Sequence, residues 1–269
     1  MSGRDAVFAG SVPALYDHHL GPLLFEPFAA DLAGRLADLA EGRVLEVAAG
    51  TGVVTRALLE VLPATVEIVA TDLNQAMLDV AKVRVRAPNV SFRQADALAL
   101  PFGEASFDAV VCQFGAMFFP DKRAGYREAW RVLKPGGRFL FNVWDRIEGN
   151  EVTQVAADAV AALFPDDPPR FLNRVPHGYH DTAAIDAELR SVGFTNVELE
   201  TVERRGRAPS PREPAVGLCQ GTPLRNEIEA RDPGRLDEAT NAAEKALVAR
   251  FGRGPVDGRM RAHVVVAIR

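Results

Sequence analysis

The sequence has little cysteine, little lysine and no long apolar run. Its 269 residues include two cysteines, Cys112 and Cys219, whose spacing fits neither a metal site nor a disulfide framework. No apolar stretch approaches the roughly 20 residues of a membrane span. The first ten residues lack the apolar core of a signal peptide. We therefore expect a cytoplasmic protein without a structural zinc site, any other bound metal or a membrane partner.

The charge balance is mildly acidic. Lys and Arg number 31 and Asp and Glu 36, which gives a formal net charge of −5. This balance lacks the electrostatic footprint of a nucleic-acid-binding protein, so we expect no nucleic-acid partner. Hydrophobic residues make up 48% of the chain, which is enough for a full core and excludes global disorder.

The first half of the chain alternates between helical and strand patterns, which is typical of a parallel α/β sheet. Short apolar runs bounded by turn residues predict five strands, at 43–48, 66–71, 90–93, 107–113 and 138–144. The segment Lys134-Pro135-Gly136-Gly137 predicts a sharp turn before the fifth strand.

The second half is less regular. Apolar stripes predict helices at 152–164, 185–192 and 236–251, and β-branched runs predict strands at 197–202 and 262–268. A proline-rich segment, 207–214, predicts a loop. No linker divides the chain, so we expect one domain over 1–269, with 145–180 and 206–255 added around its core.

Acidic and small residues follow the first three predicted strands. The first strand runs into a turn of small residues, Ala48 to Gly52, and Asp72 ends the second strand twenty residues after Gly52. Asp96 follows the third strand. Because the carboxyl ends of parallel strands meet at one edge, we expect Glu46, Asp72 and Asp96 to converge on one crevice that binds a nucleotide-like ligand.

These pieces resemble the class I S-adenosylmethionine-dependent methyltransferases, in particular the small-molecule enzymes of the ubiquinone/menaquinone-methylase-like type. The matching segments occur in the family's order within 40–145; they are Leu45–Gly52, Ala70–Leu73, Ala95–Leu98, Leu100–Phe102, Ser106–Val110 and Arg131–Gly137. The resemblance implies a Rossmann-like doubly wound seven-stranded sheet, mostly parallel with an antiparallel last strand. In this fold, 145–180 and 206–255 would be helical lid inserts that bind substrate.

The resemblance also assigns cofactor roles. The loop from Glu46 to Gly52 would wrap the methionine part of S-adenosylmethionine, Asp72 would bind the ribose hydroxyls, and Leu73 would lie beside the adenine. Asp96 and Ala97 would contact the adenine amino group, and Gln113 would lie near the methionine amine. The full cofactor set is Glu46, Ala48, Gly50, Thr51, Gly52, Asp72, Leu73, Asp96, Ala97 and Gln113. Ala48 departs from the family, which usually has glycine there.

Apolar and aromatic residues after the fourth strand predict a pocket for a small, partly apolar acceptor. The predicted substrate contacts are Phe114, Met117, Phe118 and Trp144. The alternative for Phe118 and Phe119 is packing under the following helix. Candidate catalytic residues are His177, His180 and Tyr16. A base is needed only if the acceptor must lose a proton.

Three other functions compete with this interpretation. A dinucleotide-dependent dehydrogenase would need a third glycine where Thr55 stands. A non-catalytic S-adenosylmethionine-binding protein and an RNA or protein methyltransferase remain alternatives to the small-molecule enzyme. The oligomeric state, monomer or homodimer, stays open.

Overall fold

The computed structural model describes residues 12–269, and their contacts divide the chain into two compact units. The sheet unit comprises residues 28–143, 180–202 and 262–269. Of the described residues, the helical unit comprises 12–27, 144–179 and 203–261.

A seven-stranded sheet has the strand order β3-β2-β1-β4-β5-β7-β6. Its strands are β1 (Gly42–Val47), β2 (Val66–Asp72), β3 (Val90–Gln94), β4 (Phe107–Gln113), β5 (Leu133–Trp144), β6 (Asn196–Ala208) and β7 (Val256–Ile268). The last two are longer than predicted, and their outer ends, 203–208 and 256–261, belong to the helical unit.

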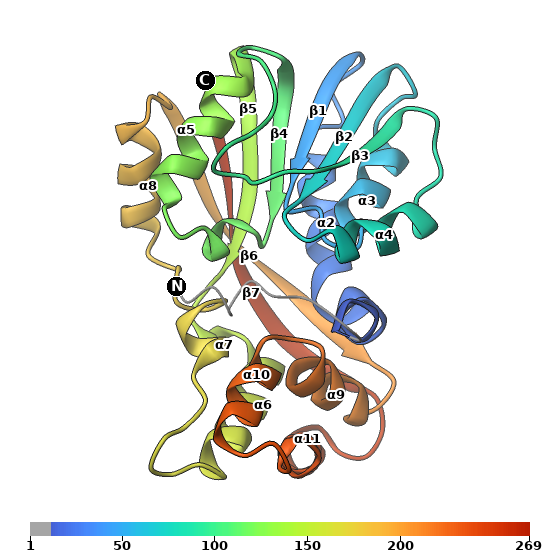
Figure 1. Ribbon diagram of the computed structural model, residues 1–269, viewed down its shortest axis with the longest axis vertical. Helices are drawn as coiled ribbons and strands as arrows, with labels where there is room; N and C mark the ends of the chain where they lie inside the picture. The colour runs from blue at the N-terminus through green and yellow to red at the C-terminus, as the bar shows by residue number, and fades with distance from the viewer. Residues whose placement is uncertain (1–11) are drawn as a thin grey trace. The chain divides into compact units, whose positions relative to one another are not determined.

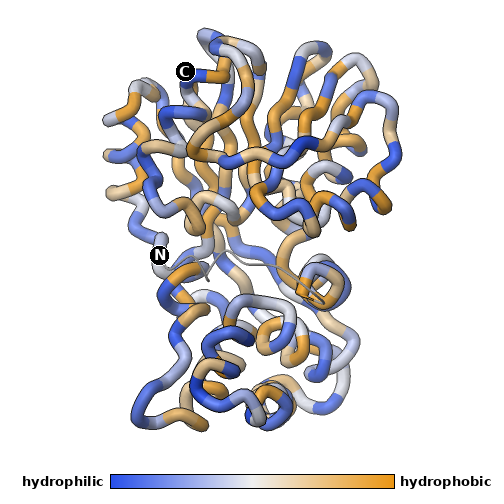
Figure 2. Tube along the Cα trace, in the orientation of Figure 1, coloured by the Kyte–Doolittle hydropathy of each residue, from blue (hydrophilic) through white to orange (hydrophobic). Residues whose placement is uncertain are grey.

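The middle of the sheet is parallel and apolar on both faces. β1 pairs in parallel with β2 and β4, β2 with β3, and β4 with β5. Val44, Leu45, Val110 and Val111 are fully buried, and these strands are largely orange in Figure 2. Continuous apolar runs are expected where helices cover both faces of a parallel sheet.

The last strand runs antiparallel to its neighbours, as predicted. The Gly136 N–H donates to the Arg269 carbonyl and the Arg269 N–H to the Gly137 carbonyl, so the start of β5 lies beside the end of β7. The Thr195 N–H donates to the Ile268 carbonyl, which places the start of β6 there too. These pairings and the strand order confirm the predicted Rossmann-like sheet.

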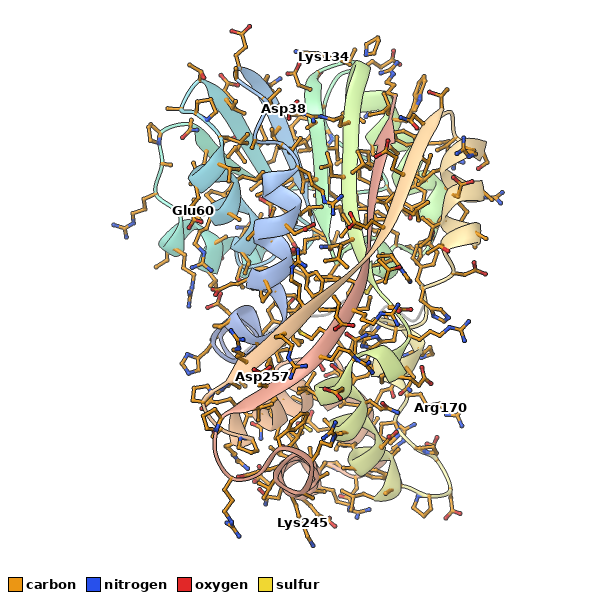
Figure 3. The ribbon with its side chains drawn as sticks, turned by 180° about the vertical axis from the view of Figure 1, so that it is seen from behind. Asp38, Glu60, Lys134, Arg170, Lys245 and Asp257 are labelled. Atoms are coloured by element: carbon orange, nitrogen blue, oxygen red, sulfur yellow. The ribbon has the colours of Figure 1, made fainter. Side chains whose placement is uncertain are left out.

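The predicted turn at 134–137 is wrong, because these residues already belong to β5. Gly136 has φ +79°, and the β4–β5 register shifts between Phe107 and Ala109, so the strand contains an irregularity instead of a turn. Lys134, labelled in Figure 3, donates to both carboxylate oxygens of Asp108 at 2.8 and 2.9 Å. This ion pair ties the start of β5 to β4.

Helices pack beside both halves of the sheet. α3 and α4 lie near β2 and β3, and α5 lies beside α8 at the β5 end (Figure 1). The helices are α2 (Glu26–Gly34), α3 (Val53–Val61), α4 (Gln75–Arg84), η2 (Ala116–Phe118), α5 (Lys122–Val132) and α8 (Thr182–Ser191). Gly193 follows α8 with φ +114°, a positive value that favours glycine just after a helix.

The helical unit holds short helices around two longer ones, α6 and α11. Its helices are α1 (Val12–Leu15), η1 (Tyr16–Phe25), η3 (Ile147–Gly149), α6 (Glu151–Ala162), α7 (Phe171–Arg174), α9 (Arg212–Gln220), α10 (Leu224–Arg231) and α11 (Leu236–Phe251). The apolar stripes of α6 and α11 are buried, for example Val160 and Leu247. The predicted loop at 207–214 is wrong, since β6 continues to Ala208 and α9 begins at Arg212.

A lid function of 145–180 and 206–255 stays a prediction, as does the single domain over 1–269.

Among residues 12–269, no helix combines the length and the apolar character needed to cross a bilayer.

Candidate cofactor site

The loop after β1 turns sharply into α3. Ala48, Gly50 and Gly52 all have positive φ, at +54°, +56° and +84°. A Cβ on Gly52 would lie 3.2 Å from the Ala81 side chain, so glycine also allows the close approach of α4. The loop therefore presents backbone at the N-terminus of α3, where anionic and polar ligand groups bind.

Asp72 ends β2 and joins this loop. One carboxylate oxygen accepts from the Gly50 N–H at 2.8 Å, and the other accepts from the Asn74 N–H at 2.8 Å. Burial raises the pKa of Asp72, and the donated N–H groups oppose this shift. Oδ1 also accepts a longer bond of 3.5 Å from the Asn74 side-chain amide, whereas Oδ2 keeps a second lone pair that can accept from a ligand hydroxyl.

Glu46, near the end of β1, is buried, as Asp72 is, and its place in the cofactor crevice stays a prediction. It is 2% exposed and accepts a 2.5 Å hydrogen bond from the Thr55 hydroxyl on α3. Burial raises its pKa to about 8, and the negative charge of Asp72 adds to the effect. Glu46 thus links β1 to α3 under the loop.

The remaining predicted cofactor residues lie along the same strand ends. The Ala95 N–H donates to the Asp72 carbonyl, which places the segment after β3 beside the end of β2. Asp96 is exposed and accepts from the Leu98 N–H, and Ala97 is half-buried. Leu73, the residue after Asp72, is 52% exposed. Gln113, at the end of β4, is half-buried.

Sequence reasoning missed two residues that shape the end of β4. The Phe114 N–H donates to both the backbone carbonyl and the side-chain oxygen of Asn142 on β5, and Phe114 has φ +48°. A Cβ on Gly115 would lie 2.5 Å from the Ala48 Cβ, so the Ala48 methyl occupies the space that glycine leaves. The signal in the sequence was Asn142, a polar residue within the apolar run 139–144.

Replacing Ala48 by glycine is expected to stabilise the protein by about 1 kcal/mol, because alanine is strained at φ +54°. The matched control is Ala57→Gly inside α3, which is expected to cost about 0.5–1 kcal/mol. Urea denaturation of the three proteins measures both effects. A loss of stability in Ala48→Gly would show that the methyl contact with Gly115 outweighs the backbone strain.

The comparisons with known proteins agree with this geometry. A family of methyltransferase domains matches residues 44–137. The chain is 32% identical over 188 residues to the ubiquinone/menaquinone biosynthesis C-methyltransferase UbiE of Pseudomonas aeruginosa, an alignment that covers 65% of this chain and 72% of that protein. It is also 49% identical over 100 residues to the demethylmenaquinone methyltransferase of Deinococcus radiodurans, which covers 36% of this chain and 41% of that protein.

The chain belongs to the UbiE-type family of S-adenosylmethionine-dependent methyltransferases. Two solved structures share the fold. Phosphoethanolamine N-methyltransferase 2 of Haemonchus contortus, in complex with S-adenosyl-L-methionine, has a TM-score of 0.62 at 18% identity and covers 96% of this chain and 56% of that one. The YcgJ protein of Bacillus subtilis has a TM-score of 0.54 at 23% identity, and the match covers 89% of this chain and 98% of that one. The predicted family and cofactor are confirmed.

The loop of this UbiE-type chain fits that cofactor in one further respect. The Thr51 hydroxyl is buried and has no hydrogen-bond partner among residues 12–269. A buried polar group without a partner is costly, and a bound ligand can supply the missing bond. Thr51 and the exposed Leu73 would thus hold polar and apolar parts of the cofactor. The individual roles of the residues stay predictions.

Removing the Thr51 hydroxyl should have opposite effects on stability and on binding. Thr51→Val is expected to leave the free protein equally stable or more stable by about 1 kcal/mol, and to weaken cofactor binding by about 1 kcal/mol. The control is Thr71→Val, equally buried at 1% exposure, whose hydroxyl donates to the Glu46 carbonyl at 2.8 Å. This variant should lose stability. Urea denaturation measures the stability of each variant, and calorimetric titration measures its affinity for the cofactor. A loss of stability in Thr51→Val would contradict the prediction.

The predicted acceptor residues of the sheet unit follow β4. Phe114 is buried with its ring edge-on to Phe28 at 5.5 Å, and Met117 is 3% exposed. Phe118 is half-buried. The packing alternative is confirmed for Phe119, because a Cβ on Gly125 of α5 would lie 2.5 Å from its ring.

The remaining candidates divide between the units. Within the helical unit, Tyr16 stacks on Phe25 at 4.8 Å, and Phe25 lies 6.4 Å from Trp144. The ring of His177 lies 5.9 Å from that of Trp144, and its Nδ1 is 2.8 Å from the Asp145 carbonyl. Tyr16, Trp144 and His177 thus share one aromatic cluster. His180 belongs to the sheet unit and is half-buried.

Proposed function

We propose that this UbiE-type enzyme methylates a carbon of a small apolar aromatic acceptor of the reduced-quinone type. The observation that carries the proposal is the match to UbiE, whose name describes C-methylation in ubiquinone and menaquinone biosynthesis. The demethylmenaquinone methyltransferase of Deinococcus radiodurans points to the same class of acceptor. The apolar residues Phe114, Met117 and Phe118 suit such an acceptor.

The cofactor supplies a methyl group on a sulfonium, which is a good leaving group. The protein's contribution is to hold the acceptor carbon in line with that methyl group and to exclude water. An aromatic ring that carries a hydroxyl group becomes a better carbon nucleophile when the hydroxyl loses its proton. A general base is therefore useful in this reaction.

We propose His177 as that base, ahead of His180 and Tyr16. The Asp145 carbonyl can only accept a hydrogen bond, so Nδ1 of His177 carries the proton in this contact. The neutral ring then has its lone pair on Nε2, the nitrogen that takes up a proton. The contact to Asp145 also fixes the orientation of the ring.

The test is methyl transfer by the full-length chain from isotope-labelled S-adenosylmethionine to a chemically reduced, short-chain naphthoquinone. We expect a label on a ring carbon, located by mass spectrometry and NMR. If folded protein binds S-adenosylhomocysteine but transfers no label to any reduced quinone, the proposed acceptor class is wrong. Label transferred to RNA or protein instead would support that alternative.

We also propose a cytosolic location. Both cysteines, Cys112 and Cys219, are free and buried, in keeping with a reducing compartment. The use of 145–180 and 206–255 to select the acceptor is likewise a proposal.

A further inference from the structure

Three side chains of types that commonly bind metals come together in the helical unit, and none of them has a role assigned above. His18 and His19 are neighbours in η1, and Glu213 lies in the first turn of α9. One donor atom from each lies within 4.8 Å of the donor atoms of the other two. Nδ1 of His19 is 2.5 Å from a carboxylate oxygen of Glu213, and the two histidine rings meet edge-on with centroids 4.7 Å apart.

The packing of α9 on η1 brings these groups together. Gly217 lies four residues after Glu213 in α9, and Gly221 follows after another four residues, directly after the end of the helix. The three residues therefore lie along one side. A Cβ on Gly217 would lie 2.5 Å from the Leu20 side chain and 2.9 Å from the His19 Cβ. A Cβ on Gly221 would lie 3.1 Å from the Tyr16 nitrogen. The two glycines let η1 lie directly against α9, so Glu213 reaches His19.

The shape of η1 also contributes. η1 is a π-helix of ten residues, a conformation that is rare in proteins and often occurs at functional sites. His18 is exposed, whereas the side chains of His19 and Glu213 are 13% and 32% exposed. The cluster is thus held on a packed helix pair and is open to solvent at His18.

We propose that His18, His19 and Glu213 bind a divalent transition-metal ion, with Zn²⁺ as the best match. Two imidazoles and one carboxylate form the donor set that Zn²⁺ takes in three-residue sites, which leave a further position for water. Tetrahedral coordination at 2.0–2.1 Å places donor atoms about 3.3 Å apart. The donor atoms of His19 and Glu213, now 2.5 Å apart, would separate to that value around an ion, and rotation of the exposed His18 side chain would bring its donor atom to the same distance. The ion would join η1 to α9.

The test uses tag-free, full-length protein that has been treated with a chelator. We expect calorimetric titration with Zn²⁺ to show one saturable site, and Co²⁺ to give the visible absorption of a four-coordinate ion that Zn²⁺ then removes. His18→Gln and Glu213→Gln should each weaken binding at least tenfold and abolish the Co²⁺ spectrum. Zn²⁺ should raise the thermal midpoint of the wild-type protein but not of His18→Gln.

The matched control is Glu238→Gln, a carboxylate on α11 of the same unit that pairs with Arg235. It should bind Zn²⁺ as the wild-type protein does. Circular dichroism checks that each variant folds, and exposed His18 is the safest position to change. The proposal is overturned if the wild-type protein shows no saturable Zn²⁺ binding, or if His18→Gln and Glu213→Gln bind as tightly as the wild-type protein.

Discussion

Replacing Asp72 by alanine is expected to weaken the binding of S-adenosylmethionine by about 1–3 kcal/mol, or roughly 5- to 150-fold. The carboxylate is buried at 7% exposure, and both of its oxygens already accept from N–H groups of Gly50 and Asn74. Loss of this buried acceptor would leave the ribose hydroxyls of the bound cofactor without hydrogen-bond partners, which accounts for the expected cost.

Two further variants separate the ligand bonds from the loop bonds. Asp72→Asn keeps one oxygen to accept from the loop but loses the charge, so its affinity should fall between those of the wild-type protein and Asp72→Ala. Asp79→Ala removes an exposed carboxylate from the neighbouring helix α4 and should bind normally. Calorimetry with S-adenosylmethionine and S-adenosylhomocysteine measures the effect. Unchanged affinity in Asp72→Ala would mean that another residue binds the ribose.

The parallel half of the fold follows from the sequence because its signals are local. β1, β2 and β4 are short apolar runs that end in turn residues. β4 has the predicted bounds, β2 ends one residue later than predicted, and β1 begins and ends one residue earlier. The order of the acidic residues after these strands places Asp72 and Asp96 at one sheet edge. The helix α11 also matches its predicted range, since its apolar stripe is long and regular.

What could not be predicted depends on contacts between distant residues. The segment 134–137 looks like a turn, yet pairing of Gly136 and Gly137 with Arg269 extends β5 through it. The burial of Glu46 depends on the Thr55 hydroxyl of the next helix. The Ala48 methyl is tolerated because Gly115, 67 residues later, has no side chain.

In the helical unit, the contacts between distant residues are even harder to predict from the sequence. His19 and Glu213 are 194 residues apart, so no spacing rule joins them. The prediction that the chain binds no metal considered only spacing along the sequence. The π-helical form of η1 and the helices α9 and α10 likewise have no clear local signal, because their burial comes from each other.

Glu46 is expected to make the stability of the protein fall as the pH rises toward 8. Its pKa is about 8 in the folded chain and 4.5 for an ordinary glutamate, chiefly because burial disfavours the charged form. Between these two values the unfolded chain has lost the proton and the folded chain keeps it, so rising pH favours unfolding. The free energy of unfolding should fall by roughly 1 kcal/mol per pH unit, and by on the order of 4–5 kcal/mol in total.

Glu46→Gln removes this titration while keeping the shape of the side chain and an oxygen that accepts from Thr55. Its stability relative to the wild-type protein should therefore increase steadily from pH 5 to 8 and level off above pH 8, as measured by urea denaturation at each pH. The control is Glu60→Gln on α3, an exposed glutamate labelled in Figure 3, which should follow the wild-type curve. If the stability curves of Glu46→Gln and the wild-type protein run parallel, Glu46 ionises normally in the folded state. The buried Glu46 would then carry a negative charge beside the Thr55 hydroxyl.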